Sequence, residues 1–261
     1  MPHQREDKHP DQRSGGVQSV HRSLDLLETV AARGGTLTIG EIAAATGVPL
    51  PTTHRLLRTL VDRGYMRQLP DRRYALGFRV VPLGAAASSM VGAGAERLLA
   101  RLVDALGETA NLAMLDGDMV AYVAQVPGRH AMRMFTEVGR RVQPHCTAVG
   151  KAILADSPEV EVRALLGRTG LVRHTDRTLT DPEAYLAALE QVRAQGYALD
   201  EGEQEVGVRC VAVALPLRPG SAPVRLALSI SGPAPRMSDD LVAEAVPLLR
   251  RTAATLADDV G

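Results

Sequence analysis

Hydroxyl and guanidinium side chains line one face of a helix predicted over residues 50–63, and both kinds of group bind DNA. These residues are Thr52, Thr53, Arg55, Arg58, Thr59 and Arg63. An arginine pairs with the edge of a guanine through two hydrogen bonds, and a hydroxyl binds a phosphate or a base. We therefore predict that this helix enters the major groove of double-stranded DNA.

Two further helices are predicted to hold this helix in place. Apolar residues recur at spacings of three and four over 17–33, which predicts an amphipathic helix. They are Val20, Leu24, Leu27, Val30 and Ala31, all expected on one face. Thr38 and Glu41 fit a capping box for a second helix, which Gly47 ends. The helix, tight turn and helix over 38–63 have the length of a helix-turn-helix.

A short β-hairpin over 65–76 follows the three helices, which predicts a winged helix-turn-helix over 17–77. Four further DNA contacts are expected in this region: Arg72 and Arg73 at the hairpin tip, and Ser19 and Arg22 on the first helix. The alternative is a three-helix packing unit whose polar face meets only water. The agreement of helix lengths, turn spacing and basic hairpin favours DNA binding.

After the hairpin the pattern changes to that of a mixed α/β domain. The pattern predicts a linker helix over residues 78–90 and a second domain over residues 91–261. A helical head followed by a domain of strands and helices gives an α+β fold class. Strands are predicted over 109–115, 119–126, 131–138, 208–217 and 224–231, and helices over 95–106, 148–155, 160–166, 181–195 and 238–260. Thr180 is expected to cap the helix over 181–195.

Composition and charge exclude several classes of protein. The 261 residues carry 30 basic and 30 acidic side chains, but residues 1–90 hold 12 basic against 8 acidic ones, which suits a head that binds a polyanion. Aromatic residues make up 3% and tryptophan is absent, which argues against base stacking on single strands. Residues 1–16 are polar and predict a disordered arm rather than a signal peptide. No segment has the roughly 20 apolar residues that cross a bilayer, so we expect a cytoplasmic protein with no membrane partner.

The cysteines and histidines show no recognisable metal or enzyme motif. Cys146 and Cys210 are not part of any CxxC pair, and the 7 histidines lack the spacing of zinc ligands, so no metal or cofactor is expected. An enzyme that uses the Cys210 thiol with a histidine base is an alternative of a different class. No hydrolase motif surrounds either cysteine, so catalysis is not the favoured hypothesis.

Polar residues of the second domain are expected to form a pocket for a small ligand. Ser229 and Ser231 lie two apart on one predicted strand, so both point to the same face of the sheet. Asp200, Cys210 and the backbone N–H groups at the start of the helix over 148–155 would join them in orienting a polar ligand. An anion would suit the helix terminus.

Short segments in both domains follow the order of a known family. In the first domain they are 17–24 (VQSVHRSL), 56–60 (LLRTL), 64–65 (GY) and 74–77 (YALG). In the second they are 144–152 (PHCTAVGKA), 196–197 (GY), 200–203 (DEGE), 207–212 (GVRCVA) and 228–233 (LSISGP). With these segments the chain resembles the isocitrate-lyase-regulator (IclR) family of bacterial transcription factors over about residues 17–258.

The resemblance implies a GAF-like effector domain and a regulatory function. It implies effector contacts at Ala148, Val149, Asp200, Cys210, Ser229 and Ser231. We therefore expect a repressor of a catabolic operon that glyoxylate or a related 2-oxo acid releases; the alternative is an activator that responds to an aromatic acid. The expected partners are an operator in double-stranded DNA, the small-molecule effector and further copies of the chain, in a homodimer or homotetramer joined through the first helix and the linker.

Overall fold

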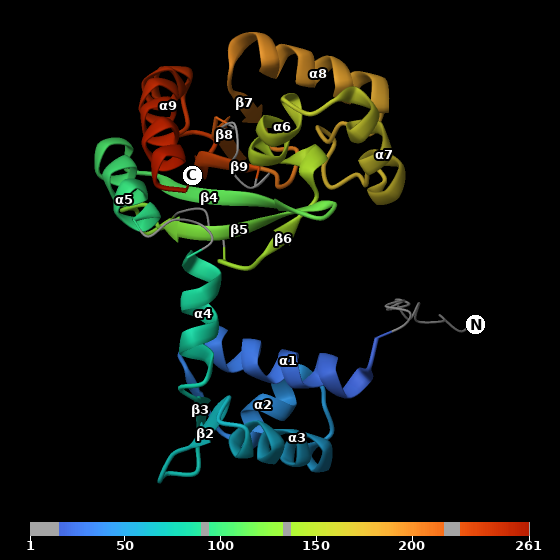
Figure 1. Cartoon of the computed structure of the whole chain (residues 1–261), viewed down its shortest axis with the longest axis vertical. Coiled ribbons are helices and arrows are strands. Elements are labelled where there is room, and N and C mark those ends of the chain that lie inside the picture. The colour runs from blue at the N-terminus through green and yellow to red at the C-terminus, as the bar shows by residue number, and fades with distance from the viewer. Residues whose placement is uncertain (1–15, 90–93, 133–136, 217–224, 261) are drawn as a thin grey trace, which may run out of the picture. The chain divides into compact units, whose positions relative to one another are not determined.

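The computed structural model describes residues 16–89, 94–132, 137–216 and 225–260. The chain divides into two compact units, residues 1–87 and 88–261 (Figure 1). All but the last residue of the predicted arm over 1–16 lies outside the described residues. In the described ranges, no helix is both long and apolar enough to cross a membrane.

The N-terminal unit contains a three-helix head and a small sheet. Its elements are α1 (Gln18–Ala32), β1 (Thr36–Leu37), α2 (Ile39–Thr46), α3 (Leu50–Asp62), β2 (Met66–Gln68) and β3 (Tyr74–Leu76). The predicted capping box is present: the Thr38 N–H donates to Oε2 of Glu41 at 2.7 Å, and the Glu41 N–H donates to Oγ1 of Thr38 at 3.3 Å. Gly47 ends α2 with a φ of 67°, which favours glycine. Strand β1, which was not predicted, pairs with β3 and gives the sheet order β1-β3-β2.

The inner face of α1 matches the predicted one only in part. Val30, which was predicted there, is fully buried, Leu27 packs against the head's core, and Leu26, which was not predicted, is also fully buried. Val20 and Leu24, expected on the inner face, are 54% and 48% exposed. The prediction failed because apolar spacing identifies an amphipathic helix without deciding which of two overlapping apolar stripes meets the core.

The C-terminal unit is built around one antiparallel sheet of six strands in the order β6-β5-β4-β9-β8-β7. The strands are β4 (Thr109–Asp116), β5 (Met119–Val126), β6 (Arg141–Val142), β7 (Ala198–Asp200), β8 (Val208–Ala214) and β9 (Leu226–Pro233). Its helices are α5 (Ala95–Leu106), the 3₁₀ helix η1 (Pro144–Cys146), α6 (Ala148–Ala155), α7 (Glu159–Thr169), α8 (Pro182–Gln195) and α9 (Asp239–Val260). Helix α4 (Val80–Ser89) precedes them and spans the boundary between the two units.

Helices cover both faces of this sheet (Figure 1). Helices α5 and α9 pack on one face around an aliphatic core that includes Leu112, Leu228 and Leu249. Helix α6 packs on the other face, against β8 and β9, and α7 and α8 lie outside it around the buried Tyr185. Every residue of α6 is buried, so its first turn lies between the sheet and the outer helices.

Two local predictions in this unit are wrong. The side chain of Asp181, rather than Thr180, caps α8 by accepting a hydrogen bond from the Ala184 N–H at 2.8 Å. The described parts of the predicted strand over 131–138 are bends and turns, and residues 133–136 lie outside the described residues. The turn predicted between β8 and β9 falls within 217–224, which also lies outside them.

Candidate functional site

The outer face of α3 carries four of the predicted DNA-binding residues. Arg55, Arg58 and Thr59 are exposed, and Thr52 is half-buried near the start of the helix. His54, which was not predicted, is exposed beside them. The head's core lies under the opposite face of α3, where Leu57 and Leu60 are buried, so these polar side chains are free to meet a ligand.

Thr53 was predicted on this outer face, and that prediction is wrong. Its side chain is fully buried, and its hydroxyl donates to the carbonyl oxygens of Val48 at 3.1 Å and Pro49 at 3.3 Å. Spacings of four and three place it in line with Leu57 and Leu60, on the inner face. Thr53 therefore stabilises the turn between α2 and α3 and is not available to DNA.

The two arginines of the hairpin formed by β2 and β3 have different surroundings. Arg72 is exposed at the hairpin tip with a φ of 65°. Arg73 is half-buried: its Nη2 donates to the carbonyl oxygen of Thr36 at 2.7 Å and lies 3.9 Å from Oε2 of Glu41. The structure thus uses Arg73 to hold β1 to the hairpin. On α1, Ser19 is exposed and Arg22 is half-buried.

In the C-terminal unit, all six residues implied for the effector line one cavity. Ala148 and Val149 come from α6, Asp200 from β7, Cys210 from β8, and Ser229 and Ser231 from β9. Sequence reasoning did not find the other lining residues, which are Tyr122, Thr147, Gln204, Glu205 and Val208. The cavity volume is about 20 Å³, which is room for about one water molecule. A larger ligand therefore has to displace side chains from this conformation.

Strand register brings the polar residues of the cavity into line. Asp200 lies opposite Cys210 on β8, which lies opposite Ser231 on β9. Ser229 lies opposite Asn111 on β4. Nδ2 of the fully buried Asn111 donates to the hydroxyl oxygens of both serines at 3.3 Å, which orients these hydroxyls at the cavity wall.

The start of α6 provides backbone donors beside the cavity. Thr147 caps the helix by accepting a hydrogen bond from the Gly150 N–H at 3.2 Å. A Cβ on Gly150 would come within 2.2 Å of the Pro144 carbonyl oxygen, so glycine is required for η1 to pack on α6. The N–H groups of a first helical turn have no intrahelical partner. Those of Ala148 and Val149 therefore suit an anionic ligand group.

The two ionisable groups on the neighbouring strands are both buried. Burial raises the pKa of Asp200 to about 6, and the nearby Glu203 charge adds to the effect. The Asp200 carboxylate accepts hydrogen bonds from the N–H groups of Gly202 at 3.0 Å and Glu203 at 2.7 Å. Burial also raises the pKa of Cys210, with a further contribution from Asp200. Cys210 is therefore a neutral thiol at neutral pH and lacks the activation of a nucleophile.

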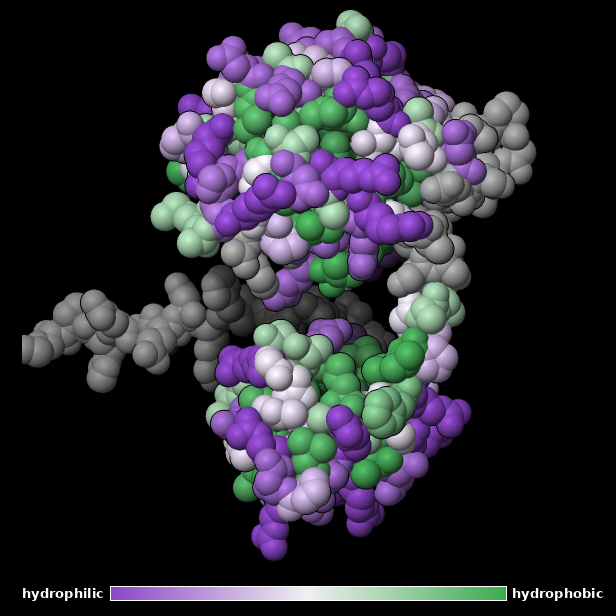
Figure 2. Space-filling view, turned by 90° about the vertical axis from the view of Figure 1, so that its left-hand side faces the viewer, coloured by the Kyte–Doolittle hydropathy of each residue, from purple (hydrophilic) through white to green (hydrophobic). Residues whose placement is uncertain are grey.

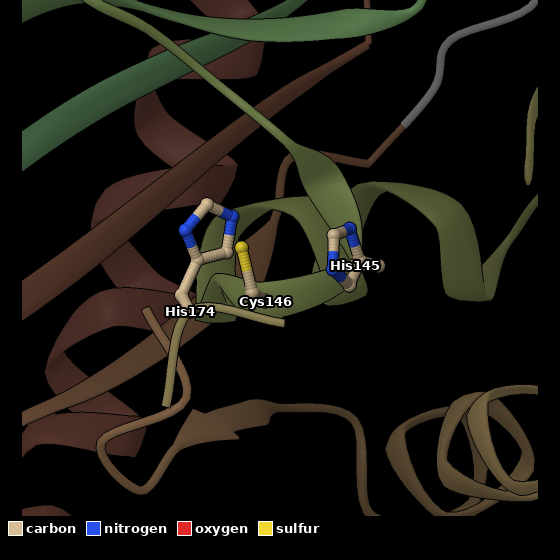
Figure 3. Close-up of side chains that lie close together, drawn as sticks. All are labelled: His145, Cys146 and His174. Atoms are coloured by element: carbon tan, nitrogen blue, oxygen red, sulfur yellow. The ribbon is translucent and has the colours of Figure 1, made fainter. Parts of the chain in front are cut away.

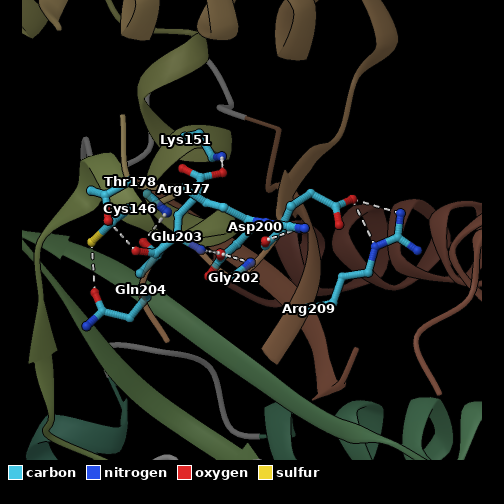
Figure 4. Close-up of polar contacts among 12 residues, drawn as sticks. Cys146, Lys151, Arg177, Thr178, Asp200, Gly202, Glu203, Gln204 and Arg209 are labelled. Carbon is cyan, nitrogen blue, oxygen red and sulfur yellow. Dashed lines mark hydrogen bonds and ion pairs between the residues drawn. The ribbon is translucent and has the colours of Figure 1, made fainter. Parts of the chain in front are cut away.

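The loop after β7 forms one side of the cavity and is held in place by the segment before α8 (Figure 4). Lys151 on α6 forms a buried ion pair with Glu203 of this loop. The Thr178 hydroxyl donates to the backbone carbonyl oxygen of Glu203 at 2.7 Å. Nη1 of Arg177 donates to the backbone carbonyl oxygen of Glu201 at 2.9 Å. The position of Gln204 and Glu205 at the cavity thus depends on contacts from two other segments.

Family models match both units of the chain. The model of the IclR helix-turn-helix domain matches residues 19–70. The model described as bacterial transcriptional regulator IclR C-terminal matches residues 85–258, more than half of the chain. The chain belongs to the IclR family. The IclR resemblance seen in the sequence, and the expected fold of a winged helix-turn-helix followed by an α/β domain, are confirmed.

Individual IclR proteins are similar over most of their length. The transcriptional regulator BhcR of Paracoccus denitrificans is 38% identical over 229 residues, which cover 87% of this chain and 81% of the relative. The transcriptional repressor IclR of Escherichia coli is 37% identical over 236 residues, 88% and 85% of the two chains. The crystal structure of an IclR transcriptional regulator from Alicyclobacillus acidocaldarius superposes with a TM-score of 0.73 at 32% identity, over 95% of this chain and all of the other.

As an IclR protein, the chain is a DNA-binding transcriptional regulator and not an enzyme. This excludes the alternative of catalysis by Cys210, in agreement with the raised pKa of its thiol. Two residues that were missed, Tyr122 in the cavity wall and Asn111 behind its serines, lie on β5 and β4, two strands that were predicted correctly. Only the order of the strands in the sheet shows that they approach the serines of β9.

Proposed function

We propose that this protein represses a catabolic operon and that a small organic acid, in the class of glyoxylate and related 2-oxo acids, releases it from DNA. The convergence of the six implied effector residues on one cavity supports an effector site there. Relatives named as repressors, including the acetate operon repressor of Salmonella typhimurium at 37% identity, support the sign of regulation. The ligand acts by binding the DNA-competent and DNA-incompetent states with different affinities.

The size and polarity of the cavity favour a compact acid. At about 20 Å³ the cavity admits neither an aromatic ring nor a small acid unless side chains move, and a molecule of a few heavy atoms needs the smaller displacement. Its carboxylate would bind the N–H groups at the start of α6, and its oxo group would accept from the hydroxyls of Ser229 and Ser231. An acid anion bound beside Asp200 would favour protonation of this carboxyl, whose pKa burial already raises to about 6.

The N-terminal region over 17–77 would bind the operator, with the helix over 78–90 as the linker and 91–261 as the effector domain in the cytoplasm. Large apolar side chains are exposed on α1 and α4 of the N-terminal unit: Val17, Val20, Leu24, Val81 and Leu83 (Figure 2 shows part of this surface in green). Exposed apolar residues on neighbouring segments are typical of an interface. We propose that two copies dimerise through them and read a near-palindromic operator.

An operator gel shift with added small acids tests both halves of this proposal. Glyoxylate or a related 2-oxo acid should weaken operator binding by the wild-type protein. The Ser229→Ala, Ser231→Ala double variant should keep its DNA affinity and lose the response. An unchanged response in this variant excludes the site, and a response to aromatic acids alone excludes the effector class.

Arg55→Ala tests direct base reading by α3. If Arg55 pairs with a base, its loss weakens operator binding by about 1–3 kcal/mol and relaxes specificity at one position. Arg251→Ala, which removes an exposed arginine of α9 in the C-terminal unit, is the matched control and should leave operator binding unchanged. Equal weakening on all sequences would make Arg55 a phosphate contact.

A further inference from the structure

Three side chains with metal-binding atoms come together beside the effector cavity, although they form no motif in the sequence. His145 and Cys146 are consecutive residues of η1 and are fully buried. His174 comes from the segment between α7 and α8 and is exposed. The ligand atoms of the three side chains lie within 4.8 Å of one another. Figure 3 shows the Cys146 thiol between the two imidazole rings, whose centroids are 6.1 Å apart.

Each imidazole is held by an oxygen atom in the way that metal-binding histidines are. Nε2 of His145 lies 3.0 Å from the carbonyl oxygen of Val172, and Nε2 of His174 lies 3.0 Å from Oε1 of Gln143. An imidazole that donates one N–H to such an oxygen carries a lone pair on its other nitrogen. In His145 that atom, Nδ1, is buried and has no hydrogen-bond partner. A bound cation would satisfy this otherwise unpaired acceptor.

Cys146 provides the third ligand atom of the site. The thiol is fully buried and donates to Oε1 of Gln204 at 2.8 Å. A metal ion displaces the thiol proton when it binds, and the thiolate and the ion then stabilise each other. Glu203 already forms an ion pair with Lys151, so the thiolate provides the negative charge at the site.

We propose that His145, Cys146 and His174 bind a divalent transition-metal ion of the zinc class. Two imidazoles and one thiolate suit this borderline-soft ion, with Zn–N distances of about 2.0–2.1 Å and a Zn–S distance of about 2.3 Å. Tetrahedral bonds of these lengths place ligand atoms about 3.3–3.6 Å apart. Rotation of the exposed His174 closes the remaining gap, and its exposure gives the ion a route from solvent. Water would take the fourth position.

The site has a consequence for the effector cavity. The thiolate of a metal-bound Cys146 can no longer donate to Gln204, and Gln204 lines the cavity. Metal binding therefore frees the Gln204 side chain and links the state of this site to the shape of the cavity. The assignment of the metal site itself does not depend on the identity of the effector or on the sign of regulation.

Cobalt and zinc titrations of the metal-free full-length protein test the proposal. We expect one Co²⁺ per chain with a thiolate-to-cobalt charge-transfer band in the near ultraviolet, and displacement of the cobalt by one equivalent of Zn²⁺. Cys146→Ser should abolish the band, whereas Cys210→Ser should keep it. Cobalt bound by histidines alone, such as His3 and His9, would give no thiolate band, so metal binding with no such band overturns the proposal.

A second variant guards against loss of folding. His174 is exposed, so His174→Ala should leave the fold intact, as circular dichroism can verify, and should weaken zinc binding by more than the roughly 10- to 100-fold that loss of an outer-shell partner costs. His54→Ala, which removes an exposed histidine of α3, should leave zinc affinity unchanged. Wild-type zinc affinity in His174→Ala refutes the site.

Discussion

Glu203→Gln tests the ion pair that supports the cavity loop. The Lys151 and Glu203 side chains are 6% and 9% exposed and form an ion pair between α6 and the loop after β7. Breaking such a buried pair leaves one charge without its partner and costs about 3–5 kcal/mol. In a unit of this size about 1 kcal/mol corresponds to a change of about 2–4 °C in Tm. We therefore expect the Tm of the C-terminal unit to fall by about 6–20 °C.

Differential scanning calorimetry of the full chain measures this change, with Glu159→Gln as the matched control. Glu159 and Arg163 form a pair on the surface of α7, with side chains 61% and 44% exposed, and such pairs contribute at most about 1 kcal/mol. Lys151→Met combined with Glu203→Leu should recover much of the loss, since no charge is left unpaired. Equal shifts in Glu203→Gln and Glu159→Gln would refute the reasoning.

Three further predictions concern other parts of the molecule. Because burial raises the pKa of Asp200 from 3.8 to about 6, the free energy of unfolding should fall by about 3 kcal/mol as the pH rises between these values, and it should stay lower above them. Asp200→Asn should remove this fall in Tm profiles from pH 4 to 8. A variant profile equal to that of the wild type would contradict the prediction. Thr53→Val leaves the Val48 carbonyl without its donor and should lower the free energy of unfolding in urea by about 1–3 kcal/mol. The variant should keep the base preference of the wild type in binding selections. An altered base preference would show that Thr53 contacts DNA. Val20→Lys with Leu24→Lys should convert dimers to monomers in analytical ultracentrifugation, and persistent dimers would place the interface elsewhere.

Features that depend on a few neighbouring residues were predictable. Thr38, Glu41 and Gly47 determine where α2 begins and ends because capping and a left-handed turn are local interactions. The alternation of Ser229 and Ser231 along β9 likewise places both hydroxyls on one face, and the structure confirms that they share a partner in Asn111. Family resemblance added contacts at Ala148 and Val149, whereas neither local pattern nor resemblance found Tyr122, Thr147, Gln204, Glu205 and Val208.

Features that depend on distant partners were not predictable. The inner faces of α1 and α3 were misjudged at Leu24 and Thr53 because an amphipathic pattern leaves the angle of a helix toward its core undetermined. Strand β1 has only two residues, too few for a periodic signal, and exists because β3 pairs with it.

The sequence by itself determined the long helices and strands, the capping box and Gly47 that bound α2, and most of the polar face of α3, because each rests on contacts within a few residues. Only the tertiary structure decided that six residues from α6, β7, β8 and β9 enclose one cavity and that His174 lies beside His145 and Cys146. The reason is that these residues are far apart in the sequence and meet only through packing. Helix α6 packs on the sheet, and the segment before α8 packs on the loop after β7.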